Sequence, residues 1–389
     1  KNIHSITTIA SSTEPTKKIT PPSDLILKCS DNIEVYEDIT VNEFITDYNV
    51  DIENGDEIVD TSSIGEHKIT VEYTYNEDSF EKDITYNVVD TTPPLLLNSG
   101  WNPYHKTGTS FDINEYVGYV DNYDKSPKLI CDGTIDPNTP GTYQLNLTAE
   151  DDAGNQTDWI TTIEVVNEIP FQADNSERYA FSDFVNECRN DGNSAGIDVS
   201  MWQGDIDFNA VKNAGCEFVI IRMGYYYDHI VMDNYYKTNI ANARAAGLKV
   251  GVYFYTTDNT EEGVRERANW IVEQLNGETL DFPIAFDWEE FANFQQYNMS
   301  IYDLNKLYLD FDNELKKNGY SAMLYSSRNF LNNFWTEKAK SNGPVWLAHF
   351  TDETDYEGEY VMWQKSAVGR IDGINGDVDL DILYSGYIN

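Results

Sequence analysis

The sequence is poor in basic residues and has no long apolar run. It contains 26 Lys and Arg against 67 Asp and Glu, which gives a formal net charge of −41 at pH 7. Because so few basic residues cannot neutralise a phosphate backbone, we do not expect nucleic acid as a partner. No apolar stretch is long enough to cross a bilayer, so we also expect no membrane span.

Cysteine and histidine are scarce as well. The four cysteines show no CxxC spacing, which disfavours a zinc site and a disulfide-dense scaffold but leaves one or two disulfides open. The five histidines show no paired spacing, and neither a Gly-x-Ser-x-Gly motif nor a phosphate-binding loop occurs. We therefore expect no metal and no cofactor, and we do not expect metalloprotease, serine hydrolase or nucleotide chemistry.

The sequence predicts that the first part of the chain is a linker followed by two β-rich copies of one module. Residues 1–22 are rich in Ser, Thr and Pro and are expected to be a linker or a disordered terminus. The segments 41–48 and 65–90 recur in pattern at 113–120 and 141–167, which predicts tandem modules at 23–91 and 92–167. Each module alternates apolar and polar residues in about seven short runs, as in an antiparallel sandwich. The copies resemble bacterial immunoglobulin-like repeats.

After a polar, partly helical joint at 168–190, the pattern changes to strands that alternate with helices. This pattern predicts an α/β domain at 191–389, an irregular (β/α) barrel with eight strands and about five helices. The expected strands are 195–200, 218–225, 249–256, 282–289, 321–326, 344–350, 360–365 and 378–383. The expected helices are 207–214, 233–246, 261–275, 301–318 and 328–338. Ser300 is expected to cap the helix at 301–318, and Asp205 or Asp207 is expected to cap the helix at 207–214.

Three apolar strands of this domain carry acidic residues. They are the segments 196–200 (GIDVS), 284–289 (IAFDWE) and 376–380 (GDVDL). Residues two apart on a strand point to the same side, so Asp287 and Glu289 can act on one substrate. Strand C-termini line the active site of a barrel, and glycoside hydrolysis needs such a set of carboxyl groups. Helix capping or ion pairing is the structural alternative, and a calcium site would need an Asp- and Asn-rich loop that this segment lacks.

The domain resembles family 25 glycoside hydrolases, the muramidases that include bacterial and phage lysozymes. The resemblance spans about 195 residues in order and rests on GIDVSMWQGDIDFNAVKNAG, FVIIRMGYYY, AGLKVGVYFYT, FDWE, VWLAHF, MWQKS and IDGINGDVDLDI. It implies a bacterial peptidoglycan substrate, cut at the β-1,4 bond between N-acetylmuramic acid and N-acetylglucosamine. The catalytic residues implied are Asp198, Asp287, Glu289 and Asp379, with Glu289 as the general acid.

The resemblance also implies the rest of the site. Asp287 would hold the acetamido N–H while the acetamido carbonyl attacks, although direct carboxylate attack or an inverting water stays open. We expected Asp287, Phe286 and Trp288 to raise the pKa of Glu289. Family members often carry Asn where this chain has Asp381, which adds a carboxyl group on the same face as Asp379. The expected substrate-binding residues are Arg222, Tyr225, Tyr255, Trp346, Trp363 and Gln364, with Arg222 orienting a carboxylate or forming a structural salt bridge.

Two other functions remain open on the sequence alone. One is a catalytically inactive protein that binds the cell wall, and the other is an acetamido-directed hydrolase of chitin-like polymers. The chain is expected to be a monomer that is secreted or associated with the cell wall, its signal peptide absent from this sequence. The two front modules are expected to act as a spacer rather than as a sugar-binding part, since neither shows an aromatic cluster.

Overall fold

The computed structural model describes residues 21–98, 103–171, 174, 176–291 and 293–387, and most of the expected linker at 1–22 lies outside them. The chain folds into two compact units, Lys1–Thr91 and Thr92–Asn389. In the described residues, no helix is both long enough and apolar enough to cross a membrane. All four cysteines, Cys29, Cys131, Cys188 and Cys216, are free thiols.

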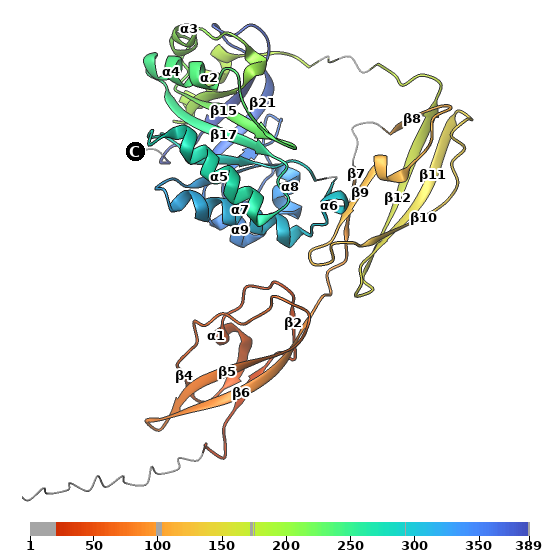
Figure 1. The fold of residues 1–389 in the computed structure, drawn as a ribbon, viewed down its shortest axis with the longest axis vertical. Helices are drawn as coiled ribbons and strands as arrows, with labels where there is room; N and C mark the ends of the chain where they lie inside the picture. The colour runs from red at the N-terminus through yellow and green to blue at the C-terminus, as the bar shows by residue number, and fades with distance from the viewer. Residues whose placement is uncertain (1–20, 99–102, 172–173, 175, 292, 388–389) are drawn as a thin grey trace, which may run out of the picture. The chain divides into compact units, whose positions relative to one another are not determined.

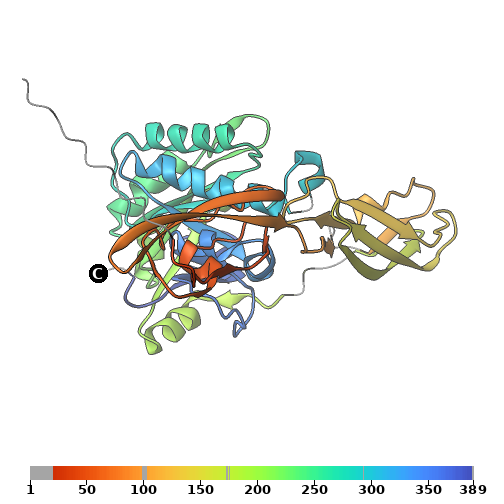
Figure 2. The same cartoon turned by 90° about the horizontal axis from the view of Figure 1, so that it is seen from below.

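The first unit is a small β module. Its main sheet has the order β2-β6-β5-β4, and β1 pairs with β3 in a second sheet. The long hairpin of β5 and β6 forms the twisted ribbon seen in Figure 2. The elements are β1 (Leu27–Cys29), β2 (Asn32–Glu34), α1 (Val41–Phe44), β3 (Ile45–Tyr48), β4 (Asp51–Ile52), β5 (Gly65–Tyr75) and β6 (Asp78–Val89).

The second unit begins with a module built in the same way. Its main sheet has the order β10-β11-β12-β8, and β7 pairs with β9. Both modules thus combine a long antiparallel hairpin with a parallel partner strand. The parallel strand differs from the purely antiparallel sheet that the sequence pattern predicted, and each module has six described strands rather than about seven. The elements are β7 (Leu95–Asn98), β8 (Tyr104–Lys106), η1 (Ile113–Glu115), β9 (Val117–Val120), β10 (Lys128–Asp132), β11 (Gly141–Glu150) and β12 (Gln156–Val166).

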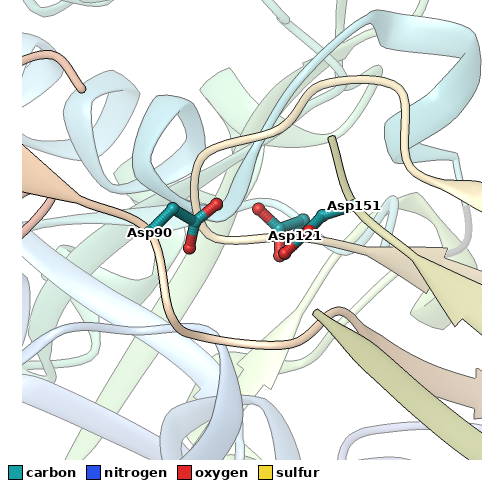
Figure 3. A group of neighbouring side chains, drawn as sticks. All are labelled: Asp90, Asp121 and Asp151. Carbon is teal, nitrogen blue, oxygen red and sulfur yellow. The ribbon is translucent and has the colours of Figure 1, made fainter. Parts of the chain in front are cut away.

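Two buried aspartates lie close together in this second module. Asp121 follows β9 and Asp151 follows β11, and their carboxylate oxygens lie within 4.8 Å of each other; both side chains are labelled in Figure 3. Asp121 accepts hydrogen bonds from the backbone N–H groups of Tyr123 and Asp124. Burial, together with the charge of Asp151, raises the pKa of Asp121 to about 6. The two carboxyl groups repel each other when both are ionised, so their closeness favours a proton on Asp121.

The second module is in contact with the barrel within the same unit. The backbone N–H of Ile301 donates to the carbonyl of Asp121, and the side chain of Gln295 donates to the carbonyl of Tyr119. Lys125 forms an ion pair with Asp303 at 2.9 Å. These contacts join the module to the short helix α6 (Phe294–Tyr297) and to the start of helix α7 (Ile301–Lys316).

The barrel has eight strands, as predicted. They are β14 (Ser194–Val199), β15 (Phe218–Tyr226), β17 (Lys249–Thr256), β18 (Ile284–Asp287), β19 (Ala322–Ser327), β20 (Val345–Ala348), β21 (Met362–Arg370) and β22 (Val378–Leu383). Neighbours from β14 to β21 are parallel, and β22 closes the barrel by pairing antiparallel with both β21 and β14. Because β22 runs the other way, its first residues lie at the end of the barrel where the parallel strands finish.

Helices cover the outside of the barrel, and α5 and α7 lie side by side in both views (Figures 1 and 2). Ser300 caps α7 in a capping box with Asp303, and Asp207 caps α3, as the sequence predicted. The helices on the barrel are α3 (Phe208–Asn213), α4 (Tyr236–Ala245), α5 (Glu261–Leu275), α7, α8 (Arg328–Asn333) and α9 (Glu337–Ser341). The expected helix at 328–338 is thus two short helices, because the turn between them carries the buried ring of Trp335.

Shorter elements complete the unit. The joint at 168–190 contains β13 (Tyr179–Ala180), which pairs with β21, and helix α2 (Phe181–Asn190), whose apolar face packs on the barrel. The remaining elements are η2 (Met201–Gln203), β16 (Ile230–Met232), which pairs with β15, and α6 (Phe294–Tyr297). The barrel core is divided into an inner cluster around Phe218, Met323 and Trp346 and a larger outer cluster between strands and helices.

Candidate active site

A hollow of about 870 Å³ opens at the end of the barrel where the parallel strands finish. Asp198 lies near the end of β14, Asp287 is the last residue of β18, and Asp379 is the second residue of the antiparallel strand β22. Asp198 and Asp379 face each other in register across the β14–β22 pair. The structure thus brings all four predicted acids, these three and Glu289, to the wall of one hollow.

Asp287 and Glu289 form an electrostatically coupled pair. Asp287 is buried, and one of its oxygens, Oδ1, has no hydrogen-bond partner among the described residues. Burial, with repulsion from Glu289 and Asp198, raises the pKa of Asp287 well above its usual range, while the charge of Arg222 opposes the rise. The pKa of Glu289 is raised too, by its enclosed position at the wall of the hollow and by the charge of Glu290. The pair therefore keeps at least one proton at a pH where isolated carboxyl groups would have lost it.

The structure adds a carboxylate to the expected causes of the raised pKa of Glu289. Phe286 and Trp288 are fully buried in the outer core, behind the strand and away from the hollow. Asp287 and Glu289 form one interacting pair, in which repulsion acts on both carboxyl groups. Glu290, which the sequence interpretation did not single out, is a further charged neighbour of Glu289.

Asp198, Asp379 and Asp381 form a second group of acids. Asp198 accepts a hydrogen bond from Gln364 Nε2 at 2.7 Å, and the indole N–H of Trp346 donates to Asp381 at 2.9 Å. Burial, followed by repulsion from Asp381, raises the pKa of Asp198, and burial followed by repulsion from Asp198 raises the pKa of Asp379 to about 8. Asp381 is fully buried, and burial with repulsion from Asp379 raises its pKa well above the usual range.

Replacing Asp381 by Asn is expected to stabilise the barrel at neutral pH. The pKa of Asp381 is higher in the folded than in the unfolded chain, so its contribution to stability is present at low pH and is lost as the pH rises through that window. An asparagine keeps an acceptor for Trp346 without needing a proton. We expect about 1–3 kcal/mol of added stability at pH 7 and a smaller difference at pH 4. Thermal unfolding of both proteins at the two pH values would check this, and equal midpoints at pH 7 would contradict it.

Arg222 and two of the predicted tyrosines line the hollow. The guanidinium of Arg222 binds the buried Asp233 through Nε at 2.9 Å and Nη2 at 2.8 Å. Asp233 also accepts the backbone N–H of Met201, so this ion pair supports the loop after β14. The hydroxyl of Tyr255 donates to Glu290 at 2.6 Å. Arg222 thus holds the carboxylate of Asp233, which is not one of the four predicted acids.

Of the other predicted binding residues, two line the hollow and one does not. Gln364 lines the hollow and connects Tyr325, which donates to its Oε1 at 2.8 Å, to Asp198. Trp346 also lines the hollow, but its ring is almost wholly buried beneath it. Trp363 does not line the hollow, since its side chain packs in the outer core and its indole N–H donates to the carbonyl of His349. Strand alternation explains the split, because Gln364 follows Trp363 directly and points to the other side.

Sequence reasoning missed several residues of the hollow. Trp202, Tyr227 and Phe350 are 77%, 58% and 60% exposed and form part of its rim. Tyr253 and Tyr325 form part of its wall. The rim residues lie in loops or strand ends, where the sequence shows no periodicity, whereas Tyr253 and Tyr325 could have been found from the alternation of β17 and β19.

A closed barrel with a hollow of paired carboxyl groups and exposed aromatic rings is the arrangement of a glycoside hydrolase. Residues 197–374 match the model of glycosyl hydrolases family 25, and residues 100–165 match the bacterial surface protein Ig-like domain. The chain therefore has a segment that matches the family 25 glycosyl hydrolases, behind a segment that matches a bacterial surface Ig-like domain.

Individual relatives match the same part of the chain. The autolytic lysozyme of Clostridium acetobutylicum is 31% identical over 196 residues, which are 50% of this chain and 56% of that protein. Lysozyme M1 of Streptomyces globisporus is 30% identical over 198 residues, 47% of this chain and 65% of that protein. The crystal structure of a lysozyme from Streptomyces coelicolor aligns with a TM-score of 0.41 and 22% identity, covering 50% of this chain and 94% of that one. The chain thus spans less than two thirds of the length of these two curated relatives.

Proposed function

We propose that this protein hydrolyses bacterial peptidoglycan at the β-1,4 bond between N-acetylmuramic acid and N-acetylglucosamine. The observation that carries the proposal is the coupled pair of Asp287 and Glu289 at the wall of the hollow, with one buried Asp287 oxygen free to accept a hydrogen bond. The family 25 domain and the lysozyme names of its relatives support this choice of substrate.

Asp287 and Glu289 take different roles when the substrate binds. We propose that the N–H of the muramyl 2-acetamido group donates to Asp287, which stabilises the ionised form of that carboxylate. The proton retained by the pair then resides on Glu289, whose side chain is the more accessible of the two. Substrate binding itself therefore places the general acid in its active protonation state.

The bond-breaking step follows from this arrangement. The acetamido carbonyl oxygen attacks the anomeric carbon, the bond to the leaving glycosidic oxygen breaks, and Glu289 gives its proton to that oxygen. Asp287 accepts the amide N–H and offsets the positive charge that forms on the acetamido group. Water then attacks the anomeric carbon and Glu289 takes its proton, while the bond from that carbon to the acetamido oxygen breaks and the free acetamido group is restored. Muramic acid is left at the new reducing end.

Substrate capture relies on short-range contacts. The net charge of −41 repels an anionic wall polymer at long range, and salt screens that repulsion. The exposed rings of Trp202 and Phe350 at the rim offer flat apolar faces on which sugars stack. We propose that the protein acts as a monomer outside the cell or at the cell wall, with the module at 23–91 as a second immunoglobulin-like sandwich and both modules as a spacer.

The product of digestion tests the proposal. Purified peptidoglycan would be incubated with the protein, reduced with borohydride and analysed by mass spectrometry. Reduced muramic acid is the expected new end. Reduced glucosamine would instead identify a glucosaminidase, cleavage of chitin oligomers alone would identify an acetamido-directed chitinase-like enzyme, and no release from several walls would favour a binding protein.

A further inference from the structure

The carboxylate of Glu290 is held in a cage of neutral donors beside Glu289. Its Oε1 accepts the hydroxyl of Tyr255 at 2.6 Å. Its Oε2 accepts the side-chain amide of Asn293 and the hydroxyl of Tyr297, the latter at 3.3 Å. Tyr255 lies on β17, and Asn293 and Tyr297 lie at the two ends of α6, so two separate segments hold one carboxylate.

This cage fixes the place of Glu290. None of its three donors carries a positive charge, so the cage contains no ion pair. Glu290 therefore places an acidic group, without a cationic partner in the cage, at the point where the chain leaves β18. An exposed glutamate on a free surface would move away from a neighbouring carboxylate, but Glu290 is held by Tyr255, Asn293 and Tyr297.

The same cage shapes the wall of the hollow. Tyr255 lines the hollow, and its ring lies 5.3 Å from that of Tyr227 on the rim. The bond from Tyr255 to Glu290 thus links the position of a wall residue to the residue next to Glu289. Tyr297 in turn packs against Trp288, whose ring centroid is 6.4 Å away, so the cage is anchored in the outer core.

We propose that Glu290 is the positioning residue for Glu289: its carboxylate, held by Tyr255, Asn293 and Tyr297, fixes the wall beside Glu289 and keeps a second acidic group next to it. This inference rests on the proposed role of Glu289 as the general acid, and it assigns Glu290 no contact with substrate. The raised pKa of Glu289, with Glu290 as its charged neighbour, agrees with the geometry.

The other ionisable groups around Glu289 must be separated from this effect. Asp287 lies on the same strand and is coupled to Glu289, and Tyr325 faces it from β19. The further ionisable groups that line the hollow are Asp198, Arg222, Tyr225, Tyr227, Asp228, His229, Tyr253, Tyr255 and Asp379. All of them remain unchanged in a Glu290→Gln variant, so a change in the titration of Glu289 can be attributed to Glu290.

The test compares the full-length protein with Glu290→Gln, which keeps the shape of the side chain and an acceptor for Tyr255. In the wild type, kcat/KM on peptidoglycan falls at high pH as the general acid loses its proton. In Glu290→Gln we expect this basic limb to move down by about one pH unit, so that activity above the limb falls up to about tenfold while activity below it is retained.

Two matched variants separate charge from structure. Tyr297→Phe removes one donor of the cage but leaves the charge, so its basic limb is expected to stay within about 0.3 units of the wild type. Glu273→Gln removes one exposed carboxylate from the far side of helix α5 and is expected to change nothing. If Glu290→Gln lowers activity equally at every pH, Glu290 is only a structural residue.

A direct titration keeps the inference testable even if the protein does not cut peptidoglycan. Carbon-13 labelling of the glutamate carboxyl groups, with Glu289→Gln used to assign the signal, gives the midpoint of Glu289 by NMR. The midpoint is expected to be lower in Glu290→Gln than in the wild type. An unchanged midpoint overturns the inference, whereas a lowered midpoint in a protein without hydrolytic activity overturns only the proposed function.

Discussion

Glu289→Gln should lower the turnover of peptidoglycan by about a thousandfold while leaving the fold intact. Glutamine has the shape of glutamate but no acidic proton, so the leaving glycosidic oxygen would depart as an unprotonated alkoxide. Removing this carboxyl group relieves repulsion in the coupled pair, because Glu289 raises the pKa of Asp287. We therefore expect a variant that unfolds at the same temperature as the wild type or slightly higher.

The measurement is kcat on soluble glycan fragments of peptidoglycan, with Glu273→Gln as the control for loss of one carboxylate. Binding of an uncleaved fragment to Glu289→Gln should remain close to that of the wild type, since a general acid acts in the transition state. A variant that keeps a tenth or more of the wild-type turnover would remove Glu289 from the acid role. A variant that loses binding as well would show that Glu289 shapes the ground state.

The sequence was most informative where the barrel is regular. All eight strands lie within a few residues of their predicted positions, because each is a buried apolar run between loops. Helix α7 was also predictable, since Ser300 and Asp303 form the expected capping box and apolar residues recur at helical spacing. In both cases the local sequence pattern favours the same secondary structure as the packing of the barrel does.

Prediction failed where the fold, rather than the local pattern, decides the position of a side chain. Trp363 and Gln364 are neighbours in the MWQKS motif, yet only Gln364 faces the hollow. The antiparallel course of β22 is not visible in its sequence either, although it is the reason that Asp379 meets Asp198. Glu290 was overlooked because its donors come from segments as far apart as Tyr255 and Tyr297.

Raised pKa values explain how this end of the barrel can hold so many acidic residues. Asp198, Asp287, Asp379 and Asp381 all have raised pKa values with burial as the first cause. Partial protonation lowers the repulsion that four ionised carboxylates would create in one barrel end. The stability of the domain therefore depends on retained protons. In the proposed mechanism, the proton retained by the pair of Asp287 and Glu289 is also the one that the general acid donates.

Asp287→Asn is expected to lower turnover by about a hundredfold to a thousandfold on acetylated peptidoglycan. The buried Oδ1 of Asp287 is the acceptor that the proposal assigns to the substrate N–H. An asparagine in its place offers a neutral acceptor at best, so the positive charge that develops on the acetamido group is no longer offset. The loss should appear in kcat more than in KM, because that charge exists only after attack begins.

A substrate change separates this role from direct attack by the Asp287 carboxylate. On glycan whose muramyl residues have been de-N-acetylated, acetamido assistance is impossible, so the wild type should lose activity and Asp287→Asn should lose little more. The two losses are then not additive, as expected for groups that act as one unit. If the wild type cleaves de-N-acetylated glycan at an undiminished rate, or if azide rescues Asp287→Asn with formation of a glycosyl azide, the carboxylate itself or a water it activates is the nucleophile. Glu289 would then remain the general acid, and the unpartnered oxygen of Asp287 would be the attacking atom or the base instead of the amide acceptor.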